Sequence, residues 1–238
     1  MPTPYNLNIM DQCTSCTLPR AGRFCDLSPK GLEDLQQMKY TGMYPKGSLL
    51  FVEGEKPRGV FILCSGKAKL TTSSSEGKTL IVRMAEAGEI LGLGSTMLDT
   101  AYEQSAETVE PSQVNFIRRE DFLRLINTHP EACLRAAQQL SKTVLSAERE
   151  IRTFGLSQTT SERLAKLILD WTKTGDETPK GIRLKVLLTH EEIAQMIGTT
   201  RETVTRVLSD FKRRKIIDVK GSTVLVPRAQ GLMDMVTV

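Results

Sequence analysis

The stretch from Thr189 to Arg206 constrains the fold of this chain more than any other segment. Its first residue and Glu192 have the spacing of a capping box, which predicts that a helix begins there. Gly198 can adopt the positive φ that ends such a helix. Either Thr199 or Thr200 can cap the helix that follows. Two capped helices joined by a tight glycine turn predict a helix-turn-helix.

The second predicted helix has one apolar and one polar face. Its apolar residues recur at i, i+3, i+4 and i+7, so they face inward: Val204, Val207, Leu208 and Phe211. The outer face and the caps supply the candidate DNA-binding residues, which are Thr189, Thr200, Arg201, Glu202, Thr205, Arg206 and Ser209. Either arginine can donate two hydrogen bonds to guanine, and the glutamate can accept one from cytosine. The pattern favours binding of double-stranded DNA over an ordinary helix with a solvated charged face.

The distribution of charge supports this prediction. The formal net charge is +4 at pH 7, yet residues 201–228 alone hold eight Lys and Arg against three Asp and Glu, a local charge of +5. Positive charge therefore collects where DNA phosphates would lie.

Other broad features point to the cytoplasm. The N-terminus lacks the basic region and apolar run of a signal peptide, and no apolar stretch approaches the ~20 residues of a membrane span. Five cysteines without a secretory signal favour reduced thiols or metal ligands over disulfides. We expect a cytoplasmic protein that has no membrane partner.

The chain divides into four predicted parts with an α+β fold. These are a cysteine-bearing arm (1–27), a β-roll or jelly roll (28–128), a long helix (129–155) and a winged helix-turn-helix domain (156–238). The β-roll is predicted from short apolar runs that alternate with glycine turns between Tyr44 and Phe116. Ser28 is expected to cap a short helix in front of it. The wing is the hairpin formed by residues 216–219 and 223–226.

Residues 130–155 are predicted to form a dimerisation helix, because no internal proline or glycine interrupts them. Apolar residues follow one another at 4-3 spacing after Cys133, and the proposed dimer seam is Ala137, Leu140, Val144, Ala147, Ile151 and Phe154. A sustained 4-3 seam favours pairing with a second copy of the same helix. A homodimer also suits a reader of two-fold DNA sites. The alternative is that the stripe packs on its own β-roll.

Together these features resemble the Crp/Fnr family of bacterial transcription regulators. The resemblance is strongest at residues 47–66 and in the Arg-Glu-Thr-Val-Thr-Arg sequence at 201–206. It implies a cyclic-nucleotide-binding-like β-roll, and half-sites of the TGTGA type read by Arg201, Glu202 and Arg206. RNA polymerase is implied as a further partner.

The resemblance does not extend to the cyclic AMP site. Family members that bind cyclic AMP place a glutamate after the glycine matching Gly92, and an arginine before the serine matching Ser105. This chain has Leu93 and Gln104 at those positions. A buried phosphate without a cation is strongly disfavoured, so cyclic AMP is not the expected effector.

Cysteines suggest a different signal. The oxygen-sensing branch of the family holds a [4Fe–4S] cluster on three N-terminal cysteines and a fourth in the β-roll. Here the candidate ligands are Cys13, Cys16, Cys25 and Cys64, although Asn115 stands where the usual fourth ligand would be. A dithiol/disulfide switch, a zinc site, no role for the cysteines, and a small-molecule effector in the β-roll remain alternatives.

Two other classes of function are weighed against the regulator. A redox metalloenzyme would use the cysteine triple, but no paired carboxylates, nucleophile–base motif or phosphate loop accompany it, and no catalytic residue is assigned. A non-specific architectural DNA binder would show steep salt dependence and little preference between sequences.

Overall fold

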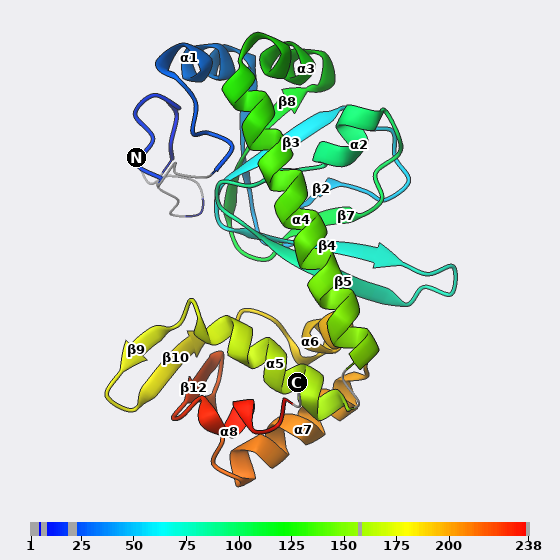
Figure 1. The fold of residues 1–238 in the computed structure, drawn as a ribbon, viewed down its shortest axis with the longest axis vertical. Helices are drawn as coiled ribbons and strands as arrows, with labels where there is room; N and C mark the ends of the chain where they lie inside the picture. The colour runs from blue at the N-terminus through cyan, green and yellow to red at the C-terminus, as the bar shows by residue number, and fades with distance from the viewer. Residues whose placement is uncertain (1–4, 6–8, 19–22, 157–158, 237–238) are drawn as a thin grey trace. The chain divides into compact units, whose positions relative to one another are not determined.

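The computed structural model describes residues 5, 9–18, 23–156 and 159–236, without the side chains of residues 153, 154 and 156. It divides the chain into two compact units, Met1–Leu145 and Ser146–Val238 (Figure 1). The long helix α4 (Pro130–Leu156) begins in the first unit and ends in the second. No helix among the described residues combines the length and the apolar character needed to cross a membrane.

The first unit contains the predicted β-roll, built from two four-stranded sheets. One sheet has the order β1-β8-β3-β6, formed by β1 (Lys39–Tyr44), β8 (Ser112–Arg118), β3 (Gly59–Ser65) and β6 (Ile90–Leu91). The other has the order β2-β7-β4-β5, formed by β2 (Leu49–Phe51), β7 (Ser105–Thr108), β4 (Lys67–Ser73) and β5 (Thr79–Glu86). Neighbouring strands are antiparallel throughout.

Alternation along the strands explains the core between the two sheets. Leu63 on β3 and Ala106 on β7 are fully buried there, because every second side chain of a strand points to the same face. Tyr102 fills the same space, with its ring stacked on that of Phe51 at 4.2 Å between centroids. Gly66 lies at φ 85° in the tight connection from β3 to β4, where a Cβ atom would stand 2.2 Å from Ser112 Oγ.

Helices cover the outer face of the β1-β8-β3-β6 sheet and form a second core. They are α1 (Pro29–Met38), α3 (Arg119–Thr128) and the first turns of α4. Ser28 caps α1 as predicted, accepting a hydrogen bond from Gly31 N. The sequence did not predict α3 or the short helix α2 (Leu93–Leu98), because both follow strands directly and neither begins with a capping side chain.

The second unit is the predicted winged helix-turn-helix. Its helices are α5 (Thr160–Thr172), α6 (His190–Ile197), α7 (Arg201–Arg213) and α8 (Gln230–Met233). Its sheet has the order β11-β12-β10-β9, formed by β11 (Asp218–Lys220), β12 (Thr223–Val226), β10 (Gly181–Lys185) and β9 (Asp176–Thr178). The hairpin β11–β12 is the predicted wing. The strand β9 and the helix α8 were not predicted.

Candidate nucleic-acid interface and cysteine pocket

The capping box at the start of α6 is confirmed. Thr189 N donates to Glu192 Oε2 at 2.8 Å, and Glu192 N donates to Thr189 Oγ1 at 3.2 Å. At the other end, Gly198 has φ 64° and its N–H donates to Ala194 O. These bonds satisfy backbone groups that the ends of a helix leave without partners, so they fix where α6 begins and ends.

Replacing Gly198 with alanine is expected to lower the free energy of unfolding by about 1–2 kcal/mol, because a Cβ atom is unfavourable in the left-handed conformation. Asparagine adopts this conformation more readily, so Gly198→Asn should lose less. Denaturant unfolding of both variants and of the unmodified chain would measure the difference. Equal losses for the two substitutions would show that left-handed strain is not the cause.

The structure decides which threonine caps the second helix. Thr200 Oγ1 accepts from Thr203 N at 3.3 Å, so Thr200 is the cap, whereas Thr199 N donates back to Ala194 O. The inward face of α7 is as predicted, and its four apolar residues are buried: Val204, Val207, Leu208 and Phe211.

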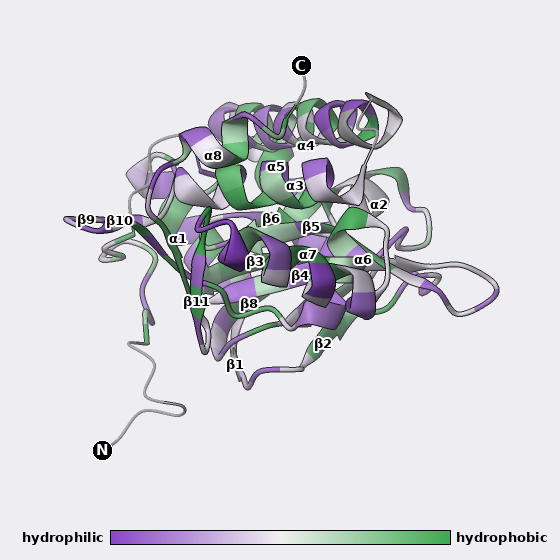
Figure 2. Ribbon diagram, turned by 90° about the horizontal axis from the view of Figure 1, so that it is seen from below, coloured by the Kyte–Doolittle hydropathy of each residue, from purple (hydrophilic) through white to green (hydrophobic). Residues whose placement is uncertain are grey.

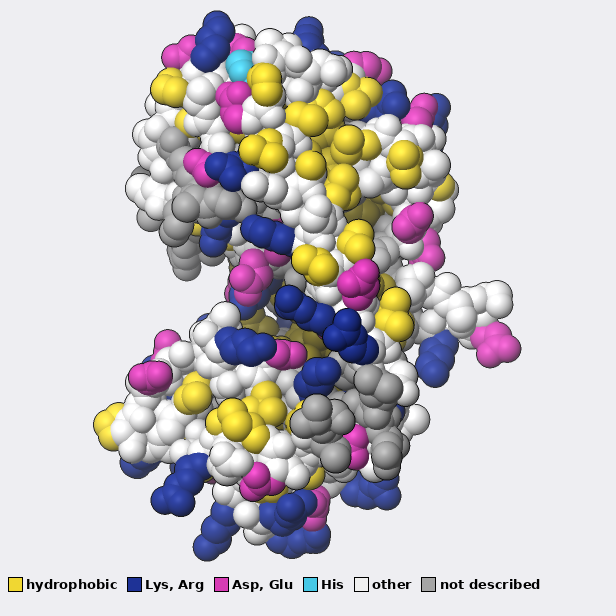
Figure 3. Space-filling view, in the orientation of Figure 1, with side chains coloured by type: hydrophobic (Ala, Val, Ile, Leu, Met, Phe, Trp, Pro, Cys, Tyr) yellow, Lys and Arg dark blue, Asp and Glu magenta, His cyan; other side chains and the backbone are white. Residues whose placement is uncertain are grey.

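All seven candidate DNA-binding residues have exposed side chains. Within the described part of the chain, Arg201, Glu202 and Arg206 take part in no ion pair or side-chain hydrogen bond, so their polar groups are available to a ligand. The four hydroxyls of the set are instead used locally. Those of Thr189 and Thr200 cap the two helices, Thr205 Oγ1 donates to Arg201 O, and Ser209 Oγ donates to Thr205 O. Figure 3 shows Lys and Arg side chains gathered along the lower edge of this unit.

Sequence reasoning missed two residues that hold the helix-turn-helix together. His190 Nδ1 lies 2.9 Å from Thr205 Oγ1 and ties the start of α6 to α7. Arg163, on α5, donates from Nε to Ile197 O at 2.9 Å and satisfies a carbonyl at the end of α6. Neither has a local sequence signal, because the partners lie 15 and 34 residues apart.

Part of the local positive charge is neutralised within the unit. Asp210 accepts from Arg213 and also lies 3.5 Å from Arg214 Nη1, at the end of α7 that is distant from Arg201. Such exposed pairs contribute little to stability. Arg213 and Arg214 are thus paired at the C-terminal end of α7, whereas Arg201 and Arg206 make no ion pair in the described chain.

The predicted dimer seam lies mostly on the outer surface of α4. Val144 is 57% exposed and Ile151 71% exposed, and Ala137 and Ala147 are also exposed. Only Leu140 packs partly against the protein's own core. The side chain of Phe154 lies outside the described residues. Figure 2 shows hydrophobic and hydrophilic residues alternating along the α4 ribbon.

A different face of α4 packs on the β-roll. Ala132 and Ala136 are buried there. One turn further along, the Gln139 side chain makes two hydrogen bonds to the backbone of β6. Its Oε1 accepts from Ile90 N at 2.9 Å, and its Nε2 donates to Ile90 O at 2.6 Å. Because α4 is held on one side by these contacts, its seam residues remain uncovered on the other.

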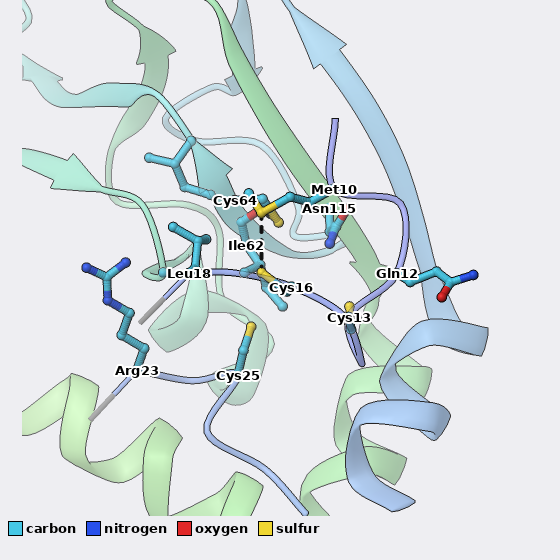
Figure 4. Close-up of a pocket in the computed structure, with 12 residues that line it drawn as sticks. Met10, Gln12, Cys13, Cys16, Leu18, Arg23, Cys25, Ile62, Cys64 and Asn115 are labelled. Atoms are coloured by element: carbon cyan, nitrogen blue, oxygen red, sulfur yellow. Dashed lines mark hydrogen bonds between the residues drawn. The ribbon is translucent and has the colours of Figure 1, made fainter. Parts of the chain in front are cut away.

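The four candidate cysteine ligands line one pocket between the N-terminal arm and β3, which Figure 4 shows in close-up. Cys13, Cys16 and Cys25 come from the arm, and Cys64 from β3. Every second residue of β3 points to the helix-covered face of the sheet, and Val60, Ile62 and Cys64 all join the core there. Ordinary strand alternation therefore places the Cys64 side chain on the face that the arm covers.

The pocket is apolar and rich in sulfur. Burial raises the pKa of the Cys64 thiol, and the neighbouring sulfurs of Cys25 and Cys13 raise it further. Cys16 Sγ lies 3.3 Å from Met10 Sδ. A buried thiol of this kind stays protonated at neutral pH unless a cation replaces its proton.

As placed, the thiols do not form a compact ligand shell. Among the residues that the structure describes, no three His, Cys, Asp or Glu side chains are grouped closely enough to hold one metal ion. Asn115 lines the same pocket, but its Oδ1 accepts from Thr41 Oγ1 at 2.8 Å. The fifth cysteine, Cys133, lies exposed on α4 and does not line the pocket.

Comparison with known proteins agrees with both units. A cyclic nucleotide-binding domain model matches residues 42–129, and a Crp-like helix-turn-helix domain model matches residues 162–235. A curated relative, the CRP-like cAMP-activated global transcriptional regulator of Mycobacterium tuberculosis (strain CDC 1551 / Oshkosh), is 26% identical over 216 residues, which cover 90% of this chain and 96% of the relative.

Solved structures share the fold. FixK2 from Bradyrhizobium japonicum matches with a TM-score of 0.74 at 19% identity, covering 84% of this chain and 98% of that protein. A CooA mutant from Carboxydothermus hydrogenoformans matches with a TM-score of 0.73 at 25% identity, covering 84% of this chain and 89% of that protein.

Proposed function

The chain belongs to the Crp/Fnr family of DNA-binding transcription regulators, and we propose that it acts as a homodimer on two-fold sites with TGTGA-like half-sites. The observation that carries the proposal is the outer face of α7. Arg201, Glu202 and Arg206 stand exposed on its first turns without partners in the described chain. In the major groove, guanine offers acceptors to the arginine N–H groups, and cytosine offers a donor to the glutamate carboxylate.

The uncovered seam of α4 supports the homodimer. A second copy would bury Val144 and Ile151, which are otherwise more than half exposed. Large apolar side chains in regular 4-3 order are stabilised when a second helix covers them. Two copies related by a two-fold axis would also present two α7 helices to successive major grooves. Regulation of transcription through this complex would bring RNA polymerase in as a partner.

Replacing Arg206 with alanine is expected to weaken binding to a TGTGA-type palindrome by about 1–3 kcal/mol and to relax the preference at one base pair of each half-site. Fluorescence anisotropy with the palindrome and with each single-base variant would measure both effects. Arg213→Ala is the matched control, because that arginine lies at the far end of α7 and pairs with Asp210. It should leave base preference unchanged.

Two outcomes would contradict the reading of DNA by α7. If Arg206→Ala weakened matched and mismatched sites equally, the residue would contact phosphate rather than a base. If the unmodified chain bound random duplex as tightly as the palindrome, an architectural binder would replace the regulator. A duplex with one half-site destroyed tests the homodimer, since a two-fold reader should lose most of its affinity.

For the effector, we infer that the cysteine pocket holds a [4Fe–4S] cluster on Cys13, Cys16, Cys25 and Cys64. The support is that these four thiols line one apolar pocket, although they come from segments far apart in sequence. Each cysteine of such a cluster binds a different iron, so its ligands stand farther apart than those of a single ion. When bound, the cluster would supply an oxygen- and redox-sensitive group.

Cyclic AMP is a poorer candidate, even though the curated relative is described as cAMP-activated. Leu93 stands where the family places a glutamate, and it is buried among apolar residues of the outer core. The hydroxyl of Ser105 accepts a hydrogen bond from Glu53 N at 2.9 Å. Gln104 offers no positive charge to a cyclic phosphate, which would therefore be buried without a counter-ion.

The visible absorption spectrum of protein purified without air would test the effector, together with assays of iron and acid-labile sulfide. A broad charge-transfer absorption that air bleaches is the expected result. Colourless, iron-free protein that resists reconstitution would exclude the cluster. It would favour a thiol switch at Cys13 and Cys16 or a small molecule in the β-roll. Steady redox turnover without DNA would instead favour a metalloenzyme.

A further inference from the structure

The arm that carries the first three cysteines is fastened to α4 directly beside the third. Arg135, on the second turn of α4, donates from Nη2 to the carboxylate of Asp26 and lies with Nε 3.4 Å from Asp26 O. The side chains of this pair are 25% and 35% exposed, so the contact is partly shielded from water. Asp26 follows Cys25 in the chain, so the guanidinium holds both the side chain and the backbone carbonyl of the residue next to the candidate ligand.

A second contact lies two residues further on, at Ser28, where the arm joins α1. Ser28 Oγ donates to Glu131 Oε1 at 2.7 Å, and this hydrogen bond lowers the pKa of the Glu131 carboxyl. The arm therefore meets α4 at two successive turns, through Glu131 and Arg135. Because both bonds end on the helix, a displacement of the Cys25 segment would have to strain or break them.

The opposite wall of the pocket is tied to the same helix. Gln139 holds Ile90 by both backbone groups, and the segment just before Ile90 includes Gly88, which lines the pocket. Arg23, from the arm, also lines the pocket and donates to Ala87 O, next to Gly88. Arg135 and Gln139 are four residues apart, so they lie on one face of α4, one turn from each other.

We propose that Arg135 is the positioning residue that couples the cysteine pocket to the dimer helix. It holds the Asp26 peptide, and through it Cys25, against α4. Ala137, the first residue of the proposed seam, lies between Arg135 and Gln139 in the same turn of α4. When the pocket thiols gain or lose a bound group, the Cys25 segment moves. The Arg135 contact then transmits this movement to α4, the helix that pairs the two copies.

The inference rests on the proposed function, but its predicted effect depends specifically on the Arg135–Asp26 contact. Allosteric coupling between two sites typically changes affinity by about 5- to 150-fold. The unmodified chain should change its affinity for the palindrome by such a factor between anaerobic protein reconstituted with iron and sulfide and the same protein after air exposure. Arg135→Gln should reduce the ratio to less than about 3-fold while it binds the same amounts of iron and sulfide.

Controls separate coupling from folding. Arg152→Gln removes an arginine from the exposed surface of α4 that contacts no described part of the arm, and it should keep the full ratio. Asp26→Asn keeps the size of the partner of Arg135 but removes its charge. It should lower the affinity ratio as Arg135→Gln does, and it replaces Arg135→Gln in the test if Arg135→Gln folds poorly. An unchanged ratio in Arg135→Gln or Asp26→Asn overturns the proposal. Loss of iron in either variant overturns it too, because the pair would then only support the pocket.

A second perturbation keeps this test independent of the cluster. In a Cys133→Ser background, N-ethylmaleimide modifies only the pocket cysteines, and the DNA affinity is measured before and after. Alkylation should change the affinity of the parent chain by about 5-fold or more, and Arg135→Gln should abolish that change. If the parent chain binds no iron but responds to alkylation through Arg135, the cluster is wrong and the coupling stands. If alkylation has no effect, or acts equally in both proteins, the coupling is wrong.

Discussion

Replacing Phe211 with alanine is expected to lower the free energy of unfolding of the DNA-binding unit by about 3–5 kcal/mol. The side chain is fully buried in a core shared with α5, α6 and the wing. Truncation removes the apolar contacts of the ring and leaves a cavity that the surrounding helices cannot fully close. Since whole domains are stable by only about 5–15 kcal/mol, this loss is large enough to populate unfolded chains.

Urea unfolding followed by circular dichroism would measure this loss, and palindrome binding would report its consequence. Phe211→Leu keeps most of the apolar volume and should lose less. Arg213→Ala, two residues along the same helix but exposed, should change stability by no more than about 0.5 kcal/mol. A loss below about 1 kcal/mol in Phe211→Ala would mean that α7 is not anchored by this ring.

Replacing Cys64 with serine is expected to abolish the iron–sulfur cluster that we propose. The residue supplies the only β-roll thiol that lines the pocket in the described chain, and a hydroxyl is a harder and weaker ligand for iron in such clusters than a thiolate. Serine has nearly the same shape, and its hydroxyl can still donate to Ile62 O, as the thiol does. The fold should therefore survive the change.

Iron and sulfide contents, with the visible spectrum, would measure the effect in protein reconstituted without air. Cys133→Ser is the matched control, because that cysteine is exposed on α4 and away from the pocket, and it should keep its full complement. Retention of the cluster in Cys64→Ser would mean that the fourth ligand comes from elsewhere. Absence of iron in the unmodified chain would exclude the proposed cluster.

Local patterns in the sequence were sufficient to predict the helix-turn-helix. The capping box at Thr189, the glycine at 198 and the four apolar residues of α7 were all correct, because each depends on contacts within one or two helical turns. The length of α4 was predicted for the same reason. The roles assigned to Arg201, Glu202 and Arg206 remain predictions, since no described contact involves DNA.

Other features depended on contacts between residues far apart in the chain. The sequence could not decide between Thr199 and Thr200 as the cap, because both offer the same hydroxyl one residue apart. It also left α2, α3, α8 and β9 unpredicted, since short elements are stabilised by packing rather than by a periodic pattern. The bond between His190 and Thr205 became visible only after α6 and α7 were packed together.

The sequence by itself determined that this chain has a glycine-punctuated β-roll, a long helix and a helix-turn-helix with a basic outer face. Only the tertiary structure decided that Cys64 lines the same pocket as the arm cysteines, and that Arg135 fastens the arm to α4. The physical reason is the range of the interactions. Helix caps and amphipathic periods are set by neighbouring residues, whereas the pocket requires the arm to pack on β3, and the Asp26–Arg135 contact joins residues 109 positions apart in the chain.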